Sequence, residues 1–232
     1  MGRKLLLLFF LVSISVQGQN FEPDRLFSKV IGDHIRSYKA KANLAIIDKD
    51  YERAEFLFDS LIKNVVNGSY LDNFEVRKLS GRTIELKDFE KPIFLMTYAS
   101  WCAPGVGEIP ALNEIAKTYA KDIDVVVLFW DSKKKVRKAS REYANNITIL
   151  YVDESENKHD HIIEKMKHSL GFPTCFFMDQ NKRIIDVRRG VLHHSDESYE
   201  TSYNLNHSAF ASGVSLLRSV GKNLANTIVS KE

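Results

Sequence analysis

One cysteine in this sequence stands where its thiol could be activated. Cys102 follows the apolar run 93–98 and precedes a helical pattern that starts at about Gly105. It is therefore expected between a buried strand and the first turn of a helix. Unpaired backbone N–H groups and the positive end of the helix dipole both favour an anion there. Since the thiolate is the nucleophilic form of cysteine, the position predicts a thiol whose pKa can fall below its ordinary value of about 8.5.

The segments on either side of Cys102 predict a parallel β-α-β unit. Residues 93–98 and 125–130 are continuous apolar runs, which is typical of strands covered on both faces. Residues 105–120 carry their apolar side chains at helical spacing. A helix that joins two neighbouring strands of one sheet makes a right-handed crossover, so the two strands are expected to be parallel.

Hydrophobic periodicity assigns the other elements along the chain. The whole pattern predicts an α/β fold in which a central mixed sheet is flanked by helices. The remaining expected elements are two helices within 21–68, a hairpin of 74–79 and 83–86, a helix over 134–144, a strand over 148–152, a helix over 159–169, a hairpin of 174–178 and 184–189, a polar loop over 193–207 and a helix over 208–229.

The first residues have the features of a secretory signal peptide. Arg3 and Lys4 precede an apolar run of about twelve residues, and small residues follow it. That run is shorter than the ~20 residues that a membrane-spanning helix needs. An uncleaved N-terminal anchor is the alternative, and contact with a membrane is expected only in that case. The expected division of the chain is a signal peptide over 1–18, a helical extension over 19–70, a main domain over 71–190, and a polar loop with a final helix over 191–232.

Composition excludes several classes of protein. The chain has 232 residues, 44% of them hydrophobic, with 33 basic and 30 acidic side chains, as in an ordinary globular protein. Loss of residues 1–18 leaves 31 basic and 30 acidic side chains, so no charge excess favours nucleic acid and none is expected as a partner. Two cysteines are too few for a disulfide-stapled scaffold or a four-thiolate zinc site.

Three short runs resemble the thioredoxin superfamily, and within it the exported thiol-disulfide oxidoreductases of the TlpA and ResA type. They are Ala99–Pro104, Glu108–Pro110 and Gly171–Thr174, and the resemblance spans about residues 74–190. It implies a thioredoxin-like fold, thiol-disulfide exchange without a cofactor, and protein or small-molecule thiols and disulfides as partners. It also implies a bacterial protein that is periplasmic or secreted.

The same resemblance implies roles for individual residues. Cys102 is the expected nucleophile and Glu108 a proton-handling group beside it. The alternative for Glu108 is an acidic residue that only favours the helix dipole. If its carboxylate approaches the thiol, it raises the thiol pKa. The substrate-binding positions implied by the resemblance, with a cis peptide bond before the second proline, are Trp101, Pro104, Phe172, Pro173 and Thr174.

The chain departs from the family pattern at one decisive position. Gly105 stands where the family has the second cysteine of Cys-x-x-Cys, so the usual internal disulfide cannot form. An outside thiol must then release a mixed disulfide, unless Cys175 does so. A bridge between the two cysteines requires Cα atoms within about 7 Å. The alternative is that Cys175 is a small buried hydrophobic residue in the core.

Other chemistries fit the sequence less well. A one-cysteine peroxidase needs a hydroxyl three residues before the cysteine and a proline seven residues before it, whereas positions 99 and 95 are Ala and Leu. A copper carrier needs a second nearby thiolate, and no metal site is expected. A non-catalytic binding module that holds a polypeptide beside Trp101 and Phe172 remains the competing hypothesis. The histidines interpreted as scattered surface residues are His159, His161, His168, His193 and His194.

Overall fold

A computed structural model describes residues 25–153, 155–156, 160–191 and 197–229, without the side chains of 160–163 and 221–229. The expected signal peptide lies outside these residues. The proposed division of the chain into domains is not tested by the structure and stays a prediction.

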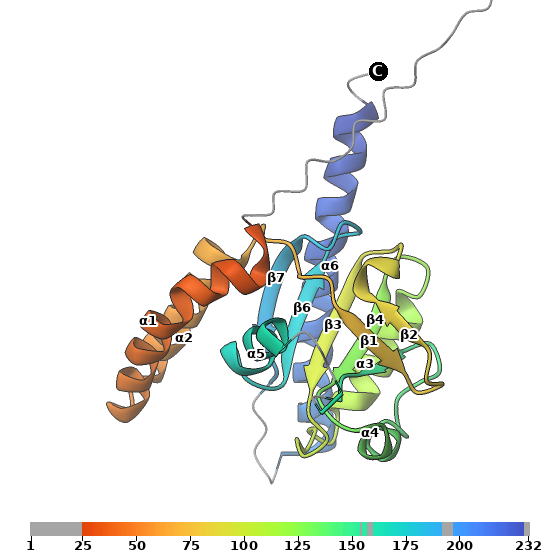
Figure 1. Ribbon diagram of the computed structural model, residues 1–232, viewed down its shortest axis with the longest axis horizontal. Helices are drawn as coiled ribbons and strands as arrows, with labels where there is room; N and C mark the ends of the chain where they lie inside the picture. Colours follow the sequence, from red (N-terminus) through yellow and green to blue (C-terminus); the bar gives the residue numbers. More distant parts are fainter. Residues whose placement is uncertain (1–24, 154, 157–159, 192–196, 230–232) are drawn as a thin grey trace, which may run out of the picture.

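A seven-stranded mixed sheet forms the centre of the molecule (Figure 1). Its strand order is β2-β1-β5-β4-β3-β6-β7. Strands β3, β4 and β5 run parallel and the other neighbours pair antiparallel. The α/β thioredoxin-like fold and the parallel β-α-β unit are therefore confirmed. The strands are β1 (Glu75–Lys78), β2 (Thr83–Glu85), β3 (Ile93–Tyr98), β4 (Asp124–Phe129), β5 (Thr148–Tyr151), β6 (Thr174–Met178) and β7 (Ile184–Arg189).

Helices cover both faces of the sheet, and its central strands β3, β4 and β6 are therefore buried apart from the half-buried Asp124 at the start of β4. One apolar core joins the sheet to α1, α2 and α5, and the other joins it to α3, α4 and α6. A short 3-10 helix (Leu86–Asp88) follows β2. The helices are α1 (Phe27–Ile47), α2 (Tyr51–Leu61), α3 (Glu108–Thr118), α4 (Lys133–Ala139), α5 (Asp160–Ser169) and α6 (Tyr199–Val229).

The two expected N-terminal helices form a hairpin that projects from one side of the sheet (Figure 1). Asp50 caps α2, since its Oδ1 accepts the N–H of Arg53 at 3.0 Å. A π-helix (Ile62–Val66) continues α2 back to the sheet. Asp72 holds the start of α1, because its carboxylate accepts both the N–H and the hydroxyl of Ser28.

The start of α6 corrects one sequence expectation. Residues 199–207, within the segment 193–207 interpreted as a polar loop, are the first turns of α6; residues 193–196 of that segment lie outside the described residues. Ser202 and Asn206 are fully buried, and the Ser202 hydroxyl accepts the N–H of Gly107 at 3.0 Å, just before α3. Small polar residues that are buried through hydrogen bonds produce no apolar stripe, so hydrophobic periodicity misses them. Helix α4 is likewise shorter than expected and ends at Ala139.

Replacement of Gly107 by alanine is expected to destabilise the protein by about 1–3 kcal/mol or more, the usual cost of overpacking. A Cβ atom at Gly107 would lie 2.1 Å from the backbone N of Tyr203 in α6, and two backbones cannot move apart without repacking both helices. Gly32→Ala is the matched control. Its Cβ would meet only the mobile Lys165 side chain, at 3.5 Å, so a gain of roughly 0.5–1 kcal/mol is expected within a helix. Urea unfolding measures both, and equal stability of the two variants would contradict this packing.

Candidate functional site

Cys102 lies in a turn between β3 and α3, at the edge where β4 also ends. The N–H of Cys102 donates to the carbonyl of Ala99 at 2.9 Å, and the N–H of Ser100 donates to Asp131 Oδ2 at 2.6 Å. Asp131 lies two residues after the end of β4. The two parallel strands therefore place Asp131 under the cysteine turn, and this carboxylate fixes the turn.

The structure corrects the expected activation of the thiol. Helix α3 begins at Glu108, not near Gly105, so Cys102 is not in its first turn. The N–H of Gly107, at the N-cap of α3, is already donated to Ser202. Burial raises the pKa of the Cys102 thiol, and the negative charges of Glu108 and Asp131 raise it further, against a hydrogen bond at Ala99 that lowers it. The resting thiol is consequently protonated at neutral pH.

Glu108 is a buried acid in the middle of the site. It is the first residue of α3 and only 2% exposed, and it is hydrogen-bonded to Tyr98. Its charge acts on Cys102 and Cys175, and it raises the pKa of Tyr98 and of Tyr143 in addition to the effect of burial. Glu108 thus occupies the first turn of α3, and its charge also acts on the thiol; its role in proton transfer stays a prediction.

Glu108→Gln is expected to lower the pKa of Cys102, because it removes a negative charge that raises that pKa. The pH midpoint of Cys102 alkylation should therefore move to lower pH, with faster reaction near pH 7. Glu114→Gln is the control, since Glu114 lies on the same helix but binds the Tyr203 hydroxyl instead. A midpoint unchanged by Glu108→Gln would mean that this acid does not act on the thiol.

The loop before β6 brings the second half of the predicted site to the cysteine turn. The Phe172–Pro173 peptide bond is cis, as the resemblance implied. The rings of Trp101 and Phe172 meet edge to face at 6.2 Å. Trp101 is 74% exposed, and Pro104 is also exposed. These side chains form an open apolar rim around a partly buried thiol.

Two of the expected site residues lie inside the molecule. Thr174 is buried, and its hydroxyl donates to the carbonyl of Gly171 at 2.8 Å. It therefore shapes the loop and does not offer its side chain to a substrate. Cys175 is also buried among core residues, and burial raises its thiol pKa. Neither cysteine forms a disulfide. Cys175 lies opposite Met96 in the antiparallel register of β6 with β3.

Within the described residues, no cluster of three or more metal-ligating side chains exists. His168 is exposed, and its backbone carbonyl accepts a hydrogen bond from Lys39. The side chains of His159, His161, His193 and His194 lie outside the part of the chain that the structure describes.

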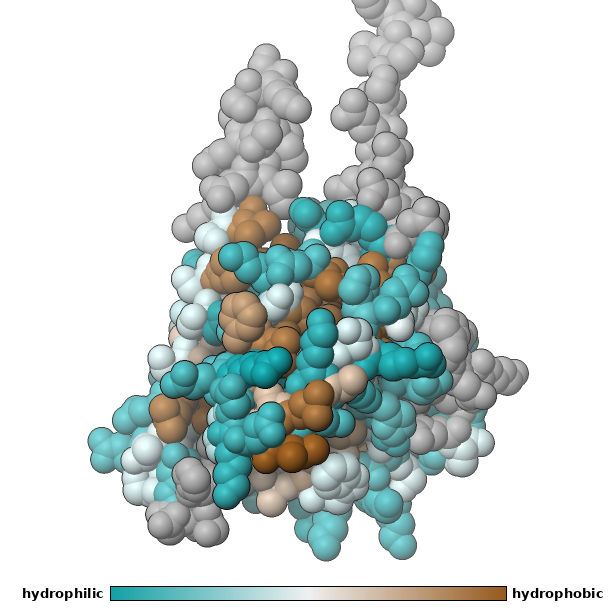
Figure 2. Space-filling model, turned by 90° about the vertical axis from the view of Figure 1, so that its left-hand side faces the viewer, coloured by the Kyte–Doolittle hydropathy of each residue, from teal (hydrophilic) through white to brown (hydrophobic). Residues whose placement is uncertain are grey.

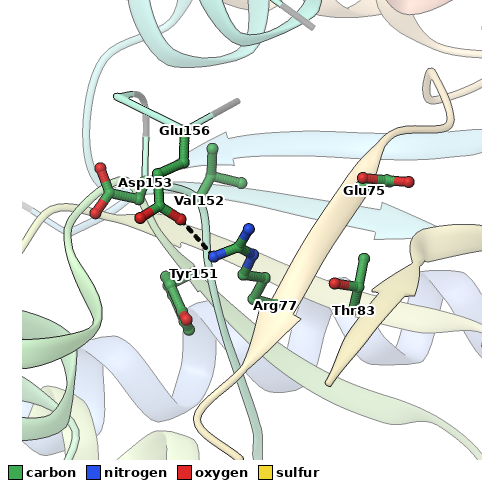
Figure 3. A pocket seen from close by; sticks show the side chains of 7 residues that line it. All are labelled: Glu75, Arg77, Thr83, Tyr151, Val152, Asp153 and Glu156. Atoms are coloured by element: carbon green, nitrogen blue, oxygen red, sulfur yellow. Dashed lines mark hydrogen bonds and ion pairs between the residues drawn. The ribbon is translucent and has the colours of Figure 1, made fainter. Parts of the chain in front are cut away.

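A polar hollow of about 190 Å³ lies beside β1, β2 and the end of β5 (Figure 3). Arg77 extends from β1 and donates to Glu156 at 2.5 Å, as Figure 3 shows. Asp153, Glu75 and Thr83 complete much of its lining. Neither cysteine borders this hollow, so it is separate from the cysteine turn.

Sequence analysis missed three residues that shape the site. Asp131 could have been found, because it follows a buried strand parallel to the motif strand, and functional residues gather at such carboxyl ends. Tyr98 was assigned only to an apolar strand, although its hydroxyl reaches Glu108. Tyr143 gave no signal, since it comes from the segment after α4 and reaches the site only through packing.

Residues 68–187 match the AhpC/TSA family. Among curated relatives, the chain is 30% identical over 126 residues to the thiol-disulfide oxidoreductase ResA of Bacillus thuringiensis subsp. konkukian, covering 53% of this chain and 69% of ResA. It is 26% identical over 132 residues to the thioredoxin-like protein YneN of Bacillus subtilis, covering 55% of this chain and 74% of YneN.

Solved structures with a similar arrangement include the thioredoxin domain of a thiol-disulfide oxidoreductase from Bacteroides vulgatus. It is 18% identical, with a TM-score of 0.48, and covers 63% of this chain and 99% of that one. A thio-disulfide isomerase from Thermus thermophilus is 20% identical, with a TM-score of 0.45, over 56% of this chain and 89% of its own.

Proposed function

Because the chain belongs to the AhpC/TSA family and has a thioredoxin-like fold, we propose that it carries out thiol-disulfide exchange through one cysteine, Cys102. The observation that carries this proposal is the position of the thiol. Cys102 is partly buried beside an exposed apolar rim and next to the buried acid Glu108. The other cysteine is enclosed in the core.

The proposed reaction has two exchange steps. The Cys102 thiolate attacks one sulfur of a substrate disulfide, so a new S–S bond forms to the protein while the old S–S bond breaks and its second sulfur leaves as a thiolate. Because Gly105 replaces the second cysteine, an external thiol then attacks the mixed disulfide and restores Cys102. Glu108 is the proposed acceptor of the Cys102 proton in the first step and its donor in the last. Phe172 and Pro173 hold the substrate chain.

We propose that the protein works outside the cytoplasm of a bacterium. The basic and apolar pattern of residues 1–18 supports export, and disulfides persist in such compartments. Among the helices that the structure describes, none has both the length and the apolar character of a membrane span.

The test of this function uses the reduced full chain without residues 1–18 and oxidised glutathione as the disulfide. Intact mass is expected to show one glutathionyl adduct, on Cys102, formed faster as the pH rises because the thiol pKa is raised. Cys175→Ala is the control and should give the same single adduct. Absence of an adduct in the folded protein between neutral and alkaline pH would contradict exchange at Cys102.

A second candidate is a non-catalytic module that binds a polypeptide at the same rim. The glycine at position 105 and the raised pKa of Cys102 favour it, because both weaken redox chemistry. The exposed ring of Trp101 against Phe172 serves either function.

A further inference from the structure

A long groove begins beside the reactive loop and runs along the edge of the sheet. It has a volume of about 910 Å³ and lies between α2 and β7. Its walls include Ala54, Phe58 and Ile62 on the helical side, and Val187, Arg189 and Gly190 on the strand side. Figure 2 faces the side of the molecule from which α1 and α2 project, and it shows apolar side chains gathered among polar ones there.

The groove is continuous with the substrate loop. Gly190 lines it, and the N–H of Gly190 donates to the carbonyl of Pro173 at 2.9 Å. The contact is so close that a Cβ atom on Gly190 would lie 2.2 Å from Pro173 Cγ. Since Phe172 touches Trp101 beside Cys102, a chain that leaves the thiol along this loop arrives at the groove.

Among the residues that the structure describes, no strand pairs with the part of the β7 edge that faces the groove. Strand β7 is the last strand of the sheet, and residues 68–70 pair only with its beginning, at Arg183 and Ile184. In an antiparallel strand, the backbone N–H and C=O groups of successive residues point alternately to the two sides of the strand within the sheet. The N–H of Gly190 points to the β6 side, where it binds the carbonyl of Pro173. The backbone groups of Val187 and Arg189 therefore point to the other side, into the groove. In agreement, the Val187 N–H donates to the side chain of Asp186 and not to β6.

Arg189 gives the groove a cation next to the reactive loop. Its guanidinium lies 4.2 Å from the centre of the Phe58 ring and donates to the Tyr38 hydroxyl. Within the described residues no carboxylate forms an ion pair with it. Glu55 and Asp59 lie on the opposite wall. An acidic side chain of a bound segment is therefore favoured where the Arg189 guanidinium lies over Phe58, with apolar side chains against Ala54 and Ile62.

We propose that an extended segment of a protein substrate adds as an extra strand to the edge of β7, inside this groove, while its own sulfur reacts at Cys102. Main-chain hydrogen bonds to Arg189 and to the carbonyl of Val187, whose N–H is held by Asp186, give affinity, and the apolar wall with Arg189 gives selectivity. The N-terminal helices thereby select polypeptide disulfides over small ones. This inference rests on the proposed exchange at Cys102.

The test compares two disulfides on the full chain without residues 1–18. The peptide probe has a cysteine activated by 5-thio-2-nitrobenzoate and an arm of about eight alternating leucine and aspartate residues, which spans at most ~28 Å. The arm is placed either before or after the cysteine. The small probe is 5,5′-dithiobis(2-nitrobenzoate). A peptide with N-methyl groups along its arm is the matched control, since it keeps the side chains but cannot donate main-chain hydrogen bonds.

Arg189→Glu is expected to slow the reaction with the better peptide at least about tenfold, while the small probe reacts within about twofold of wild type, because only the peptide meets the groove charge. Arg189→Gln, which removes the charge without reversing it, should give an intermediate rate. The N-methylated peptide should lose its advantage over the small probe. Arg82→Glu, an exposed charge reversal in the β1–β2 turn, should change neither rate. If the wild type and Arg189→Glu react with the peptide probe at equal rates, the proposal that a peptide binds in the groove is wrong.

Binding separates failure of the groove from failure of the chemistry. The peptide probe, now without its activating group, carries a fluorescent label. Its binding is measured by fluorescence anisotropy to two proteins, the Cys102→Ser variant and the Cys102→Ser/Arg189→Glu double variant. If no probe reacts but Arg189→Glu and N-methylation still weaken binding, the exchange proposal fails and the groove stands. If neither change weakens binding, the groove proposal is wrong. Sedimentation tests a second copy of the chain as the occupant of the groove. A dimer that Arg189→Glu disrupts, while peptide binding does not change, would assign the β7 edge to the dimer and also overturn the groove proposal.

Discussion

The Cys102→Ser variant is expected to form no mixed disulfide and to give no exchange above the rate measured without protein. A serine hydroxyl cannot form an S–S bond, and Cys175 cannot replace the lost thiol because it is buried and burial raises its pKa. The fold should survive the change. The turn that holds Cys102 is fixed by backbone groups and by Asp131, not by the thiol.

The matched variant is Cys175→Ala, which should keep exchange and lose roughly 1–2 kcal/mol of stability through its core position. Absorbance assays of disulfide exchange and peptide anisotropy are measured on both variants. If Cys102→Ser still binds the peptide and the wild-type protein shows no exchange, the binding-module hypothesis replaces the exchange hypothesis. Retained exchange in Cys102→Ser would place the reactive thiol elsewhere and contradict the site.

The sheet could be predicted from sequence because its central strands are buried on both faces. Residues 93–98, 125–130 and 174–178 are continuous apolar runs between turn signals, and these features are local. Parallel pairing of β3 with β4 follows from the handedness of the crossover. Most of the candidate site was also predictable, since Cys102, Glu108, Phe172 and Pro173 lie in short runs that resemble a family.

The electrostatics of the thiol could not be predicted, because it depends on where α3 begins. Gly105 and Gly107 flank a stretch whose conformation local propensity leaves open. The buried start of α6 occupies the N-cap of α3 through Ser202. A contact between residues 95 positions apart has no signature in one sequence. The helix dipole therefore acts away from Cys102, and burial decides the direction of its pKa shift.

The partners of the thiol also depend on tertiary structure. Glu108 is charged, and as a residue of a helix start it should be exposed by composition alone. It is buried because Tyr98 supplies a hydrogen bond and Tyr143 closes the site from the segment after α4. The sequence left both roles of Glu108 open, and only the packing of three segments reveals that its side chain is buried.

Gly190 lines the groove and contacts Pro173 in the loop before β6. Gly190→Ala is therefore expected to reduce the rate of exchange strongly. The new Cβ atom would lie 2.2 Å from Pro173 Cγ and 3.1 Å from its Cδ, so Pro173 must move, and with it the loop whose Phe172 contacts Trp101. A displacement of about 1 Å at a positioning residue can cost ~10²-fold in rate. A loss of that order is expected for exchange with the peptide disulfide, while alkylation of Cys102 by iodoacetamide, which needs no loop, changes by less than about threefold.

Gly213→Ala is the matched control for the clash itself. Its Cβ atom would lie 2.1 Å from the Phe177 ring, in the core between α6 and the sheet, so it should lose comparable stability, about 1–3 kcal/mol. It does not touch Pro173, and its exchange rate should stay near wild type at temperatures where both variants are folded. If Gly190→Ala exchanges with peptide disulfides as fast as Gly213→Ala, then Pro173 does not position the substrate. If both variants lose exchange equally, stability and not loop position limits the reaction.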